Sequence, residues 1–126
     1  MPEMKTPGNS GWIAHGGPDS AAAVAFYKQV VGWQMGDLAP EGSEPFPGIM
    51  LEDGPIGHFS PQPQPDAGWT IYFTVTDVDA SVDRAIKGGA QVISPLMDMP
   101  GVGRMATLKD PQGASFALIT YESMQS

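Results

Sequence analysis

The sequence predicts an α+β fold built from two similar modules, each a strand, a helix and about three further strands. The evidence is an internal repeat: residues 11–35 and 68–93 both open with Gly-Trp, continue through a short strand to an aspartate, and then run as a helix that ends at glycine. Asp19 and Asp77 are 58 positions apart, and Gly32 and Gly89 are 57 apart. Repetition at a near-constant spacing indicates two copies of one structural unit.

The two expected helices begin at Asp19 and Asp77. An aspartate at this position caps a helix, because its carboxylate accepts hydrogen bonds from first-turn amides and suits the positive end of the helix dipole. Apolar residues then recur at three- and four-residue spacing, which predicts one buried stripe for each helix. The predicted stripes are Ala23, Phe26, Tyr27, Val30 and Val31 in the first helix, and Val78, Val82, Ala85 and Ile86 in the second.

Proline separates the modules. Seven prolines lie between residues 40 and 65, where helix and continuous sheet are both disfavoured, so loops and short strands are expected there. The stretch "SPQPQPDAG" at 60–68 is typical of a semi-rigid extended connector. The predicted organisation is one domain over 1–126, with module one at about 8–60, the connector at about 60–68 and module two at about 68–121.

The second module should close with a hairpin over 104–119. The turn "DPQG" separates two extended segments, and alternation along "SFALIT" places Phe116 and Leu118 on one face, with Ala117 and Ile119 on the other.

Composition excludes several classes of function. Six basic residues against fourteen acidic ones give a formal charge of −8, which repels nucleic acid and anionic membranes. No apolar run approaches the roughly 20 residues of a membrane-spanning helix. The chain has no cysteine, so disulfides and thiolate chemistry are excluded. The start "MPEMKTPGNSGW" does not have the pattern of a secretory signal, so we expect a cytoplasmic protein.

The repeat, the run "PDSAAAVAFYKQVVGW" and the turn in "DPQGASFALI" resemble the glyoxalase, bleomycin-resistance and extradiol dioxygenase superfamily, also called vicinal oxygen chelate proteins. The resemblance spans roughly residues 8–121. It implies tandem βαβββ modules that form a curved, half-open β-barrel with helices on the outer face and a ligand on the concave face. It also implies a homodimer.

The resemblance implies metal ligands at positions that this sequence does not fill. Histidine usually stands seven residues before each helix-start aspartate, where this chain has Trp12 and Thr70, and a carboxylate follows the turn, where it has Ala117. Indole, a lone hydroxyl and a methyl group cannot hold a divalent ion usefully. We therefore expect no metal and no other cofactor.

Two ionisable residues remain as weak candidates for metal or acid–base work. Glu52 falls near the remaining ligand position, and His58 could reach a pocket beside it; a solvated pair at a strand end is the alternative. His15 differs from Trp12 by an odd number of residues, so it should point toward the helix as a hydrogen-bonded structural histidine.

Three further residues are candidates for ligand binding. Trp12 and Tyr72 fall on the expected concave face and could line a pocket, although core packing explains them equally well. Arg104 could hold a ligand carboxylate through a two-pronged contact, or it could pair with one of the many surface acids.

The leading hypothesis is a metal-free protein that binds a small molecule in a concave pocket lined by Trp12, Tyr72, Arg104, Glu52 and His58. One alternative is a lyase or isomerase of the glyoxalase type that uses Glu52 and His58; a dioxygenase is less favoured. Another is a structural or partner-binding dimer with a filled concave face.

Overall fold

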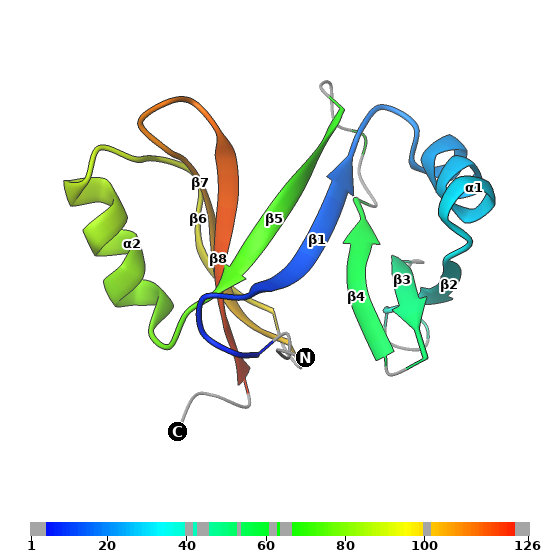
Figure 1. The fold of residues 1–126 in the computed structure, drawn as a ribbon, viewed down its shortest axis with the longest axis horizontal. Coiled ribbons are helices and arrows are strands. Elements are labelled where there is room, and N and C mark those ends of the chain that lie inside the picture. The colour runs from blue at the N-terminus through cyan, green and yellow to red at the C-terminus, as the bar shows by residue number, and fades with distance from the viewer. Residues whose placement is uncertain are drawn as a thin grey trace. The chain divides into compact units, whose positions relative to one another are not determined.

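The structure is a computed structural model, and it describes residues 5–39, 42, 46–52, 54–60, 63, 67–99 and 102–122. Both predicted modules are present in the expected order (Figure 1). The first comprises β1 (Ser10–Gly16), α1 (Ser20–Val31), β2 (Gln34–Asp37), β3 (Pro47–Leu51) and β4 (Gly54–Phe59). The second comprises β5 (Gly68–Thr74), α2 (Val78–Lys87), β6 (Gln91–Met99), β7 (Gly103–Lys109) and β8 (Ser115–Tyr121). The α+β class and the tandem βαβββ modules are thus confirmed.

The two modules share one topology. The strand order is β2-β3-β4-β1 in the first and β6-β7-β8-β5 in the second. In each, the first strand pairs in parallel with the last, and the remaining pairs are antiparallel. In both modules the strand that follows the helix, β2 or β6, lies at the edge of the sheet. The strands of neither module therefore close into a barrel.

Two compact units make up the chain: residues 13–70 form one, and residues 1–12 with 71–126 form the other. The divisions fall inside β1 and β5, so each of these strands contributes to both units. Most of the expected proline-rich connector at 60–68 lies outside the described residues.

In the second unit, α2 packs on the sheet through Val78, Val82 and Ala85 as predicted, but Ile86, the fourth residue of the expected stripe, is 49% exposed. Val78 and Val82 are buried against Ala106, Leu108 and Leu118, and Figure 1 shows α2 beside the strands of this unit. Antiparallel pairing of Ala106 with Leu118 confirms the hairpin and the face assigned to Leu118.

The stripe predicted for α1 is wrong in part. Phe26, Val30 and Val31 are 57%, 62% and 50% exposed, and no residue of α1 is fully buried. The partly buried stripe consists instead of Ala23, Val24 and Tyr27. Because α1 is apolar on nearly all sides, its sequence does not mark which side faces the sheet.

The caps of both helices are as predicted. The Asp19 carboxylate accepts a hydrogen bond from the Ala22 amide at 3.0 Å, and Asp77 accepts one from Ala80 at 3.2 Å. Gly32 ends α1 with φ of 81°, a left-handed conformation that glycine adopts without a steric penalty. Neither helix in the described part of the chain is long and apolar enough to cross a membrane.

Candidate functional site

The positions that the resemblance assigns to metal ligands hold no usable donor. Trp12 lies in β1 and is 8% exposed, Thr70 lies in β5, and Ala117 lies in β8 with no exposed surface. Among the described residues, no group of three or more His, Cys, Asp or Glu side chains could hold a metal ion. The residues at these three positions therefore do not fit the usual divalent ion.

A tyrosine and a threonine flank the alanine that stands at the carboxylate position. Ala117 pairs with Tyr72 on β5 and with Thr107 on β7, so these three side chains form a row on one face. The side chain of Thr107 hydrogen-bonds the Tyr72 phenol; burial nevertheless raises the pKa of Tyr72, and this hydrogen bond only partly offsets the effect. The methyl group of Ala117 is thus packed between two polar side chains.

This face of the second unit is filled. Its side chains are buried: Tyr72, Met105, Ala117, Ile119 and Tyr121. Trp12 is buried as well. The Tyr121 hydroxyl also donates a hydrogen bond to the Gly11 carbonyl, which ties β8 to the start of β1. Trp12 and Tyr72 therefore belong to the core and leave little surface for a ligand. Core packing was one of the two roles that the sequence allowed for them.

Arg104 is held by two acids. Its Nε lies 2.7 Å from Asp79 Oδ1 and its Nη2 3.3 Å from Asp79 Oδ2, while Nη1 lies 3.1 Å from Asp98 Oδ2. The hydrogen bond with Asp79 is the main cause that raises the pKa of Arg104 and lowers that of the carboxyl. The guanidinium joins α2 to β6.

Glu52 and His58 are not side by side. His58 pairs across the hairpin with Gly48, whereas Glu52 follows the last residue of β3, Leu51. At about 3.3 Å per residue, roughly 10–13 Å of strand separates the two positions. The His58 ring packs against Phe46 with centroids 4.9 Å apart, and burial lowers its pKa to about 4. The register of the hairpin therefore does not bring Glu52 and His58 together as a pair.

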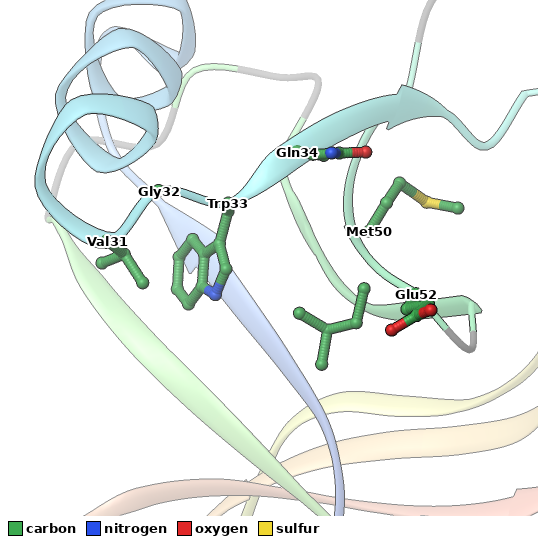
Figure 2. Close-up of a pocket in the computed structure, with 7 residues that line it drawn as sticks. Val31, Gly32, Trp33, Gln34, Met50 and Glu52 are labelled. Carbon is green, nitrogen blue, oxygen red and sulfur yellow. The ribbon is translucent and has the colours of Figure 1, made fainter.

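Glu52 instead lines a pocket of about 590 Å³ in the first unit (Figure 2). The pocket lies where α1 ends and the β2–β3 pair begins, because Gly32 turns the chain and Gln34 pairs with Met50. Its lining residues are Val31, Gly32, Trp33, Gln34, Met50, Leu51 and Glu52. The sequence analysis assigned only Glu52 among them to a site, although Gly32 and Trp33 belong to the motif that carries the resemblance.

A cluster of rings positions Trp33. Its ring centroid lies 5.9 Å from those of Tyr27 and Trp69, and the Trp69 indole N–H donates to the Tyr27 hydroxyl at 3.2 Å. Contacts with α1 and with β5 therefore fix the indole on two sides while one part of it lines the pocket. Trp33 is half-buried, so it retains surface for a ligand.

His15 belongs to the same cluster. Its ring contacts those of Tyr27, Phe59 and Trp69, so it faces the helix as predicted. Its buried Nδ1 has no hydrogen-bond partner within the described part of the chain, so the expected hydrogen bond is absent at this atom. Burial lowers the pKa of His15, which makes it a neutral packing residue at neutral pH.

The pocket lining combines apolar and polar side chains. Four of its lining side chains are apolar or aromatic, one is an amide and one is a carboxylate. The lining is therefore mixed, with apolar side chains beside polar groups that could orient a small organic molecule.

This chain is similar to known proteins in sequence and in fold. A model of the Glyoxalase-like domain matches residues 12–119. The putative glyoxylase CFP32 of Mycobacterium tuberculosis is 36% identical over 99 residues, which cover 77% of this chain and 38% of that protein. The anthracycline biosynthesis protein DnrV of Streptomyces peucetius is 33% identical over 129 residues, covering 89% and 46%. The chain thus spans less than half the length of these curated relatives.

A solved structure has the same fold at lower identity. A variant methylmalonyl-CoA epimerase of Streptomyces coelicolor, in complex with 2-nitronate-propionyl-CoA, aligns with a TM-score of 0.62 and 18% identity. The alignment covers 96% of this chain and 99% of the epimerase chain. At this identity the likeness bears on the fold alone.

Proposed function

Because this chain belongs to the Glyoxalase-like domain family, we propose that it binds a small organic molecule without a divalent metal, in the pocket that Trp33 and Glu52 line. The observation that carries the proposal is the pocket itself: about 590 Å³, lined by an indole, aliphatic side chains, an amide and a carboxylate. The filled face around Tyr72 supports this placement, because it offers a ligand little surface.

The metal-free part of the proposal is supported by the residues at the three ligand positions. Trp12, Thr70 and Ala117 together offer one hydroxyl, which is a poor ligand for a divalent ion. Metal content of protein purified without chelator tests this part, together with the melting temperature before and after EDTA. We expect less than a stoichiometric amount of metal and no change in melting temperature. A stoichiometric ion whose removal lowers the melting temperature would overturn it.

The binding part is tested with a panel of small molecules in a thermal-shift assay with EDTA present. A ligand that binds the folded state raises the melting temperature in a concentration-dependent way. Anthracyclines and bleomycin belong in the panel, because one relative is named for anthracycline biosynthesis and the superfamily includes bleomycin-resistance proteins. A compound that binds should bind more weakly to the Leu51→Ala variant. The Leu51 side chain is half exposed and therefore adds little to stability. If no compound binds, the structural or partner-binding alternative replaces this proposal.

A lyase or isomerase activity is the second candidate, favoured by the glyoxylase name of one relative. Since Glu52 and His58 lie apart, one of them would have to act alone as the base. Turnover assays of wild type, Glu52→Gln and His58→Gln on glyoxalase and epimerase substrates test it, and turnover abolished by one replacement would favour the enzyme.

The proposal also includes a cytoplasmic homodimer with no nucleic-acid or membrane partner. The formal charge of −8 supports the absence of phosphate-rich partners. The dimer is supported by the family resemblance and by the length of the relatives, which could hold two such chains. Analytical ultracentrifugation tests it: a monomer at micromolar concentration would contradict the dimer.

A further inference from the structure

We infer that the pocket beside Trp33 selects ligands that carry a positive charge next to a flat ring. The inference deepens the proposed function and rests on it. It concerns the charge of the ligand, which neither the family nor the names of the relatives specify.

Two independent features give the pocket a negative field. The first is Glu52, which is exposed and is the sole ionisable residue among the described residues that line the pocket. The second is the C-terminal end of α1. Val31 is the last residue of this 12-residue helix and Gly32 is its cap, and both line the pocket. The C-terminus of a helix carries a partial negative charge of about one half of an elementary charge, and it favours cations.

Among the described residues, no positive side chain lines the pocket to cancel this field. Lys28 lies in the last turn of α1 but is not a lining residue. An anionic ligand would therefore meet a carboxylate and the negative end of a helix with no counter-charge from the lining. The formal charge of −8 of the whole chain acts in the same direction at longer range.

The apolar part of the pocket suits a ring. Figure 2 shows the Trp33 indole in the same hollow as the Met50 side chain and the Glu52 carboxylate. Contacts of Trp33 with Tyr27 and Trp69 hold the indole in place, so little side-chain freedom is lost when a ligand packs on it. An indole attracts both aromatic rings and cations, and the thioether of Met50 adapts to irregular surfaces.

A matched set of probes tests the inference: an aminoacridine that is cationic at neutral pH, uncharged acridine, and an anionic acridine carboxylate. The three rings are alike in size, so differences in affinity report charge. Titration calorimetry at low salt should give about five- to twentyfold tighter binding of the cation than of acridine. The carboxylate should bind more weakly than acridine, and the preference for the cation should shrink as salt is added.

Two variants assign the charge preference to this pocket. Glu52→Gln removes the carboxylate at an exposed position. It should reduce the ratio of the affinity for the cation to the affinity for acridine about three- to fivefold. Asp83→Asn removes one negative charge from an exposed position of α2 that does not line the pocket, and it should leave the ratio unchanged. Circular dichroism of both variants checks that they are folded.

Equal affinity for the cation and for acridine would overturn the charge preference and leave the proposed function standing. An equal drop of the ratio in Glu52→Gln and Asp83→Asn would also overturn the inference, because it would assign the preference to overall charge. If none of the acridines binds, the inference fails; the proposed function fails with it only if the wider panel of compounds in EDTA also gives no binding.

Discussion

The largely buried imidazole of His58 should make the stability of this protein depend on pH. His58 lies in β4, opposite Gly48 on one side and Ala14 on the other, with its ring against Phe46. Burial lowers its pKa from 6.5 to about 4, because a charged imidazolium is poorly solvated there. In the unfolded chain the same group should titrate at its ordinary value.

The sign of the effect follows from proton uptake. Between pH 4 and 6.5 the unfolded state binds more protons at this residue than the folded state, so the free energy of unfolding rises with pH across this window. Each pKa unit corresponds to 1.36 kcal/mol, so the shift amounts to about 3 kcal/mol. The contribution of His58 to the free energy of unfolding is fully present above pH 6.5, decreases as the pH falls, and is absent below pH 4.

Urea denaturation of wild type and His58→Gln measures the effect. Glutamine keeps a polar side chain but does not titrate, and the carboxylates that also respond to acid are common to both proteins. We expect the stability advantage of wild type over the variant to fall by about 2 kcal/mol between pH 7 and about pH 5. His15→Gln is the control: burial lowers the pKa of His15 as well, but less, so its curve should diverge less from wild type. Parallel curves for wild type and His58→Gln would refute the reasoning.

The parts of the fold that could be predicted are those that depend on local chemistry or on the repeat. The caps at Asp19 and Asp77, the turn after Asp110 and the alternation around Leu118 each involve a few consecutive residues, so the sequence alone specifies them. The duplication then gave the order of elements in both modules. Residues that must pair across strands were harder to place.

The candidate site shows this limit. The separation of Glu52 from His58 depends on the register of the β3–β4 hairpin, which carries an irregularity between Ile49 and Met50, and no local pattern encodes that register. The pocket joins the end of α1 to β3, two segments that the sequence does not relate. Arg104 could have been a ligand-binding residue or an ion-pair partner, and only the positions of Asp79 and Asp98 decided this.

Three further substitutions test these assignments. Asp19→Ala and Asp77→Ala should each lower the free energy of unfolding in urea by about 1 kcal/mol, because each removes a helix cap; no cost would contradict the capping role. Arg104→Met should leave acridine affinities unchanged in calorimetry, since its guanidinium is paired with acids and does not line the pocket; weaker binding would return it to the site. Ala117→Glu buries a carboxylate where no surface is exposed, so it should cost about 3 kcal/mol or more. Adding Mn²⁺ should not recover that loss, because an indole and a lone hydroxyl stand at the other two ligand positions. If Mn²⁺ restored the melting temperature, the fold would still supply a metal site, and the missing carboxylate alone would explain why the wild-type protein does not bind the ion.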